Sequence, residues 1–231
     1  MSAVRRLLES ERETERRFAA VAKAHETAPK GWPASLLLFH LAQWRGRMVV
    51  ALSDVRDGRQ QTLPPENTDE FNDAELSDGA GVSLEVAAAR CDEALASMIE
   101  LYEAVGERPF SWRISKTTTE AVVRSGYIHP RLHITEYMKE NGDTPGAHRL
   151  VEEGVSEMQE AGAPPAALGT AIYNLACVRV AQGRMDEALK LLEEAIPLRS
   201  DLAATAATDP DLGPLRDHAG FRALVSVQPE R

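Results

Sequence analysis

The chain has 231 residues, of which 43% are hydrophobic and 27% charged, and its formal net charge is −10. This length can bury one substantial hydrophobic core or two modest ones. The acidic balance argues against nucleic acid as a partner, because no basic face is available to neutralise phosphates, and it disfavours binding to an anionic membrane. Aromatic residues are few and Ala, Leu, Glu and Arg are abundant, which favours an all-α fold.

The sequence predicts a cytoplasmic protein. Its first residues run directly into a charged segment without the apolar stretch of a signal peptide, and no apolar run reaches the length of a membrane span. Cys91 and Cys177 lie far apart in apolar, helical contexts. We expect two buried, reduced thiols rather than a disulfide.

In chain order, apolar residues at helical spacing predict four helices in the first part of the chain, at about 3–25, 33–57, 83–105 and 117–141. Pro33 suits the first turn of the second helix, and Ser83 is a predicted N-cap of the third. Residues 58–81 are polar and turn-rich, so we expect a long loop, a kind of segment that is often functional. Residues 108–112 predict a second ordered loop.

The fourth helix contains Pro130. A proline inside a helix removes one backbone hydrogen bond, and its ring presses on the carbonyl four residues earlier, which here belongs to Gly126. The sequence therefore predicts a kink in this helix.

Residues 143–146 (DTPG) are the clearest domain boundary, which gives predicted domains at 1–142 and 147–231. The second domain has three shorter helical stretches, at about 147–160, 165–182 and 185–198. Turns then precede an apolar tail, and residues 212–225 are expected to cap the last exposed apolar face.

Three of the six histidines form a pattern. His129 and His133 stand four residues apart, which places both on one helix face. His40 lies on the apolar stripe of the second helix and can supply a third nitrogen across the core. Three neutral imidazoles suit zinc, nickel or iron(II) and leave coordination positions open for water or substrate, as catalytic sites do. The alternative is a set of hydrogen-bonded core histidines beside a polar cavity.

Other candidate site residues carry weaker signals. Asn72, in the predicted long loop, is a candidate for orienting a ligand, and Trp44 and Tyr137 have the spacing to line the site. Glu11 and Thr14 interrupt the apolar stripe of the first helix and are expected to reach the same cavity. The sequence has no nucleophile elbow, phosphate loop or dinucleotide fingerprint, so the catalytic residues are not defined.

Three segments carry a resemblance to a known family: residues 32–44 (WPASLLLFHLAQW), 69–72 (DEFN) and 127–133 (YIHPRLH). They resemble the second helix, the Asp-x-x-Asn segment and the paired-histidine helix of DinB-like (DfsB-like) proteins, over roughly residues 1–142. The resemblance implies a four-helix bundle of up-down-down-up topology and a three-histidine metal site that opens into a pocket. It also implies an activity, since some members are metal-dependent transferases that use low-molecular-weight thiols.

Residues 173–195 resemble one tetratricopeptide repeat. Ala176, Ala188 and Ala195 would let two antiparallel helices approach closely, and Gly183 would form the turn between them. One and a half repeats cannot form a long peptide-binding groove. We expect this region to pack against the bundle or against another subunit, as in a homodimer, rather than to bind a protein partner in a groove.

Two functions remain open from the sequence. The first is a metal-dependent transferase or hydrolase that acts on a small electrophilic substrate, with His40, His129 and His133 as ligands. The second is a non-catalytic protein that binds a small molecule or serves as an interaction scaffold. The remaining alternative is a helical scaffold whose histidines are relics.

Overall fold

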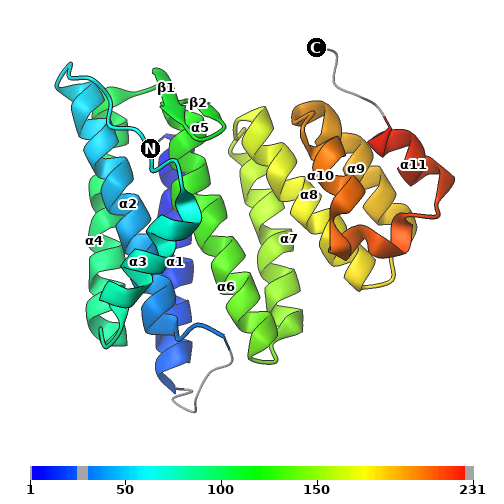
Figure 1. Cartoon of the computed structure of the whole chain (residues 1–231), viewed down its shortest axis with the longest axis horizontal. Coiled ribbons are helices and arrows are strands. Elements are labelled where there is room, and N and C mark those ends of the chain that lie inside the picture. Colours follow the sequence, from blue (N-terminus) through cyan, green and yellow to red (C-terminus); the bar gives the residue numbers. More distant parts are fainter. Residues whose placement is uncertain (1, 25–30, 227–231) are drawn as a thin grey trace. The chain divides into compact units, whose positions relative to one another are not determined.

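The computed structural model describes residues 2–24 and 31–226, and it confirms the prediction of an all-α protein (Figure 1). The chain divides into two compact units, Met1–Ala147 and His148–Arg231. Within the described residues, no helix is both long enough and apolar enough to cross a membrane.

Unit 1 is built on four long helical rods, which agree with the predicted helices to within about two residues at the ends. They are α1 (Ala3–Ala24), α2 (Ala34–Arg56), α4 (Leu84–Val105) and a composite rod of α5 (Thr118–Val123), the π-helical turn η1 (Arg124–Ile128) and α6 (His129–Glu140). In Figure 1, α1 and the composite rod run in one direction while α2 and α4 run in the other. The most extensive packing joins α2 to α4.

The segment predicted as a long loop contains a helix, so that part of the prediction was wrong. α3 (Thr68–Gly79) lies within residues 58–81 and packs against α2. The Asn67 side chain accepts a hydrogen bond from the Glu70 backbone N–H and donates one to the Glu70 carboxylate. The first of these bonds satisfies a backbone donor that the start of a short, polar helix would otherwise leave unpaired, and the second joins the two side chains.

The predicted loop at 108–112 is also corrected, because it forms half of a β-hairpin. Strand β1 (Pro109–Trp112) pairs antiparallel with β2 (Ser115–Thr117), and Pro109 lies opposite Thr117. Phe110 and Trp112 are buried, and their stacked rings anchor the hairpin with centroids 6.1 Å apart. At the turn, Arg113 has a φ of 54°, in the left-handed region.

Pro130 lies in the first turn of α6, and the turn of π-helix directly precedes this helix. The proline has no N–H for the Gly126 carbonyl, and that carbonyl accepts a hydrogen bond from the Arg45 guanidinium instead (3.3 Å). Any side chain at Gly126 would press on Met98 and Leu8. The sequence predicted a kink at this place, and the structure has a wider helical turn held by a buried arginine.

Unit 2 is a set of short helices around an apolar core. They are α7 (Thr144–Glu160, which begins within unit 1), α8 (Pro165–Ala181), α9 (Met185–Leu198), α10 (Leu202–Thr208), the 3-10 turn η2 (Pro210–Leu215) and α11 (Ala219–Val225). The sequence predicted α7, α8 and α9 but not α10. Cys177, on α8, is half-buried rather than buried as expected, whereas Cys91 in unit 1 is buried; both are free thiols.

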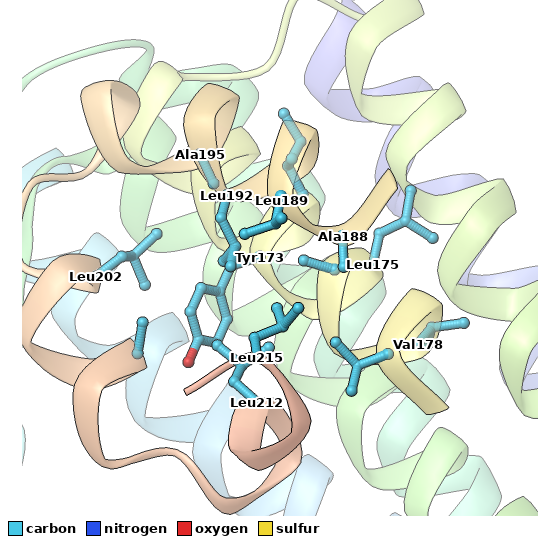
Figure 2. Close-up of a cluster of buried hydrophobic side chains, with 14 of the residues drawn as sticks. Tyr173, Leu175, Val178, Ala188, Leu189, Leu192, Ala195, Leu202, Leu212 and Leu215 are labelled. Atoms are coloured by element: carbon cyan, nitrogen blue, oxygen red, sulfur yellow. The ribbon is translucent and has the colours of Figure 1, made fainter. Parts of the chain in front are cut away.

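The core of unit 2 lies between α8 and α9 and is closed by the segments that follow them (Figure 2). Ala176, Ala188 and Ala195 have no exposed surface, which lets the two helices approach closely. Leu212 and Leu215 from η2 are buried in the same cluster. The tail that was expected to cap this region thus contributes side chains to its core.

Candidate metal centre

The structure brings His40, His129 and His133 together, although they come from two separate rods of unit 1. His40 is buried on α2, while His129 is the first residue of α6 and His133 follows one turn later. The Nε2 atom of His129 lies 3.0 Å from Nε2 of His133 and 3.4 Å from Nε2 of His40. One ligand nitrogen from each ring lies within 4.8 Å of the others.

These separations fit one metal ion better than they fit hydrogen bonding alone. A neutral imidazole Nε2 carries either one lone pair or one N–H in the ring plane, so His129 can pair with only one of its two neighbours. Metal–nitrogen bonds of about 2.0–2.1 Å, at tetrahedral to right angles, place two ligand nitrogens about 3.0 to 3.4 Å apart. The separations of His129 from His133 and from His40 thus match the spacing of two ligands on one metal ion, and all three ligand nitrogens lie within 4.8 Å of one another.

The protein keeps two of these imidazoles neutral. Burial and the neighbouring His133 lower the pKa of His40 to about 4. Burial, His133 and His40 together hold the pKa of His129 well below its ordinary value. Both rings are therefore neutral imidazoles near neutral pH, and each can offer one nitrogen lone pair to a cation.

A carboxylate lies next to His133, the third candidate ligand. Nδ1 of His133 lies 3.6 Å from the Glu136 carboxylate, one turn further along α6, and this contact lowers the pKa of Glu136. A proton held on Nδ1 leaves Nε2 free for a cation, which is the usual arrangement behind metal-binding histidines.

Two tryptophans surround the histidine cluster. The Trp32 ring stacks on His133 with a centroid distance of 5.8 Å and meets His40 edge-on at 5.4 Å. Trp44 lies 6.3 Å from His40 and 6.4 Å from His129. Trp44 was predicted to line the site and does so, whereas Trp32 was not singled out because it precedes the helix on which His40 lies.

The other predicted lining residues lie differently from expectation. Asn72 is on α3 rather than in a loop, and its side-chain oxygen accepts a hydrogen bond from the Trp44 indole (3.1 Å). Asn72 thus orients a tryptophan of the site. Tyr137 packs edge-on against Phe18 of α1, with ring centroids 5.0 Å apart, rather than against the three histidine rings.

Glu11 and Thr14 were predicted to reach the cavity from α1, but their side chains form other contacts. Thr14 donates to the Ser10 carbonyl of its own helix. Glu11 has no exposed surface and accepts a hydrogen bond from Arg131 (2.6 Å), while its second carboxylate oxygen has no partner. Burial is the main reason that the pKa of Glu11 is raised to about 8, although Arg131 opposes the shift.

A second buried ion pair lies in the same core. Arg45 is fully buried and donates to both carboxylate oxygens of Glu15 and to the Cys91 thiol (3.0 Å). It also donates to the backbone carbonyls of Cys91 (3.5 Å) and Gly126 (3.3 Å). Arg45 thus connects α1, α2, α4 and the turn that leads into His129.

Sequence reasoning missed this network, although two signals for it exist. Arg131 lies between His129 and His133 in the sequence, where helical spacing turns it away from them. Acidic residues on the inward stripe of α1 require buried partners, and Arg45 and Arg131 are those partners. The network fixes the helices that carry the histidines.

Comparisons of the chain with models of protein families, with curated proteins and with solved structures found no match. A functional interpretation of this chain therefore rests on the chemistry and geometry of its own residues, above all on the three converging histidines.

Proposed function

We propose that the chain is a metal-dependent enzyme of the DinB-like kind, which transfers a thiol or water to a small electrophilic molecule. His40, His129 and His133 are the ligands of one divalent ion. The observation that carries this proposal is the convergence of three Nε2 atoms, with contacts of 3.0 and 3.4 Å, from two rods of the bundle.

The donor set favours catalysis over a purely structural role. Structural zinc sites are closed by four protein ligands, whereas three protein ligands leave positions for solvent or substrate. The candidate group among the described residues has three members, and all of them are histidines. A bound divalent ion would supply Lewis acidity, which lowers the pKa of a coordinated thiol or water so that the anion forms near neutral pH.

The residues around the ligands have separable tasks in this proposal. Trp32 and Trp44 present aromatic rings beside His133 and His129, and they exclude water from that side. Asn72 fixes the orientation of the Trp44 indole. Glu136 holds a proton on Nδ1 of His133 and thereby keeps Nε2 unprotonated.

Unit 2 is proposed to be a tetratricopeptide-like helix pair with its own cap. The buried alanines between α8 and α9 and the turn at Gly183, which has a φ of 75°, support this interpretation. Because Leu212, Leu215 and Phe221 cover the apolar surface of the pair, we assign it a role in packing or association rather than in peptide capture.

A thermal unfolding series tests the proposed enzyme. Zinc, nickel or iron(II) is added to metal-free protein, and each melting temperature is recorded for the wild type, for His40→Ala/His133→Ala and for His218→Asn. A ligand present at about 100 times its dissociation constant stabilises the folded state by about 2.7 kcal/mol. We expect at least one metal to raise the melting temperature of the wild type and of His218→Asn, a control at an exposed histidine of unit 2.

The metal that stabilises the wild type is then used in an assay of thiol addition to a small electrophile. Turnover that requires both the metal and the histidines supports the proposal. Equal stabilisation of the double variant and the wild type, or turnover that persists in the double variant, contradicts it.

A further inference from the structure

Arg113, at the turn of the β1–β2 hairpin, has an unusual backbone conformation. Its φ of 54° makes it the one non-glycine residue with positive φ in residues 2–24 and 31–226. Left-handed backbone costs an ordinary side chain free energy that glycine does not lose. A glycine would suit the backbone of this turn better, which indicates that the arginine side chain has a role of its own.

The side chain of Arg113 carries a charge that no carboxylate balances. Its guanidinium donates one hydrogen bond to the neutral Thr68 hydroxyl (2.7 Å), and no carboxylate of the described residues forms an ion pair with it. Arg47 provides a contrast. Its guanidinium lies against the Phe71 ring, 3.7 Å from the centroid, but it is neutralised by Glu75 at 2.7 Å.

The exposed guanidinium of Arg113 lies near Trp44, one of the two tryptophans of the candidate metal centre. It lies 6.0 Å from the centroid of the Trp44 ring, on the indole that also contacts His129. Its charge is among those that act on the His129 imidazole. The hydrogen bond to Thr68, at the start of α3, holds the guanidinium beside Trp44 and leaves other donors available, because a guanidinium carries five N–H groups.

We propose that Arg113 is the anion-binding residue of this site and recognises a carboxylate on the small-molecule substrate. The inference rests on the proposed function, because it places the reacting end of the substrate at the three histidines and its carboxylate at the hairpin. The planar fork of a guanidinium matches a carboxylate, and one guanidinium balances its single negative charge. A phosphate dianion would call for further cationic partners.

Charge around the centre supports this choice of ligand. Three neutral imidazoles leave the charge of a bound divalent ion uncompensated, and Arg113 adds another positive charge nearby. The Glu136 carboxylate lies beside the cluster, where it faces Nδ1 of His133, and it is largely exposed. The centre is thus locally positive in a chain of net charge −10, which attracts a small anion selectively.

The test uses the full chain reconstituted with cobalt(II), whose visible absorption reports on ligands near the ion. Succinate and acetate are titrated at constant ionic strength, and the visible spectrum and the tryptophan fluorescence are both followed.

We expect Arg113→Gln to weaken succinate binding at least tenfold, while acetate binding changes less. Arg113→Lys, which keeps the charge but not the fork, should lose less than Arg113→Gln. Lys116→Gln removes a charge from the same hairpin and should stay within twofold of the wild type.

A second variant separates recognition from structure. Arg113→Gly relieves the left-handed backbone, so it should weaken succinate binding as much as Arg113→Gln does without lowering the melting temperature. If Arg113 only fixes the hairpin to α3, Arg113→Gly will lower the melting temperature and leave succinate binding unchanged.

Failure of this inference is distinguishable from failure of the proposed function. Cobalt stoichiometry is measured first and depends on the histidines alone. A wild type that binds no cobalt contradicts the proposed function, and the fluorescence titration of the metal-free chain then tests Arg113 by itself. A wild type that binds no succinate, or an Arg113→Gln variant within twofold of it, overturns the assignment of Arg113.

Discussion

The two units bury different kinds of residues. Unit 1 encloses a charged network, made of the pairs Glu15–Arg45 and Glu11–Arg131 and the thiol of Cys91, close to the segment that carries the candidate ligands. The core of unit 2 is aliphatic and alanine-rich, and its main buried hydroxyl, that of Tyr173, donates to Asp209 (2.6 Å). In Figure 2 this tyrosine lies among leucines of α9, α10 and η2.

The contrast distinguishes a core that only stabilises the fold from a core that also positions a site. Burying an ion pair is costly, and a hydrophobic replacement of similar volume is often at least as stable. Within residues 148–226, the ion pairs of unit 2, such as Arg179–Glu152, are only partly buried. In unit 1 the charged groups hold specific backbone and side-chain positions next to the three histidines, so we interpret them as devices that position the site.

The largest expected effect comes from breaking a buried pair. Arg45→Met should lower the free energy of unfolding of unit 1 by about 3–5 kcal/mol, because it leaves the Glu15 carboxylate and the Gly126 carbonyl buried without their partner. Urea unfolding followed by circular dichroism measures the change. Arg12→Met, which removes a partly exposed ion pair between α1 and α4, should cost about 1 kcal/mol or less.

The double variant Arg45→Met/Glu15→Met sharpens this prediction. Removing both charges should recover much of the stability but not the position of His129, so metal affinity should stay reduced. Recovery of both stability and affinity would show that the network has no positioning role.

An apolar core responds through packing alone. Leu192→Ala in unit 2 should cost about 2–5 kcal/mol, because Leu192 has no exposed surface and its truncation leaves a cavity. The same variant should bind metal with unchanged affinity. Loss of metal binding in Leu192→Ala would contradict the separation of roles between the two units.

The histidine cluster should give metal-free unit 1 a distinct pH dependence. His40 takes up a proton near pH 6.5 when unfolded but only near pH 4 when folded. Between these values the unfolded state binds more protons, so stability falls as the pH is lowered through this window. His40→Gln should show a decline that is smaller by about 3 kcal/mol, since one pKa unit corresponds to about 1.36 kcal/mol. Identical pH profiles for variant and wild type would exclude this contribution.

A small effect is expected from the polar contact in unit 2. Tyr173→Phe removes the hydrogen bond to Asp209 and should cost about 1 kcal/mol, because Asp209 keeps its bond to the Asp211 backbone N–H. A loss near that of Leu192→Ala would mean that the unit 2 core also depends on a polar network. Thermal unfolding of the two variants in parallel makes the comparison.

Elements with a strong local signal could be predicted from the sequence. The apolar stripe of α2, the Ser83 cap of α4 and the turn at Gly183 each arise from neighbouring residues. Helical spacing also indicated that His129 and His133 share a face. The third histidine was placed correctly because the α2 stripe points into the bundle.

What could not be predicted depends on contacts distant in the sequence. α3 has a weak apolar pattern, so its cap at Asn67 and its packing against α2 decide its existence. The π-helical turn requires Arg45 to satisfy the Gly126 carbonyl across 81 residues of chain. The left-handed backbone of Arg113 could not be predicted, because in a sequence only glycine or asparagine indicates such a conformation.

The binding of one metal ion by the three histidines is best tested by elemental analysis of untagged protein purified without chelators. Metal content per chain is measured by mass spectrometry for the wild type, for His40→Ala/His133→Ala and for the control His218→Asn. The convergence of the three histidines predicts one divalent ion per chain in the wild type and the control, and its loss in the double variant. A wild type that carries no metal even after reconstitution, or a double variant that keeps its metal, would contradict the account.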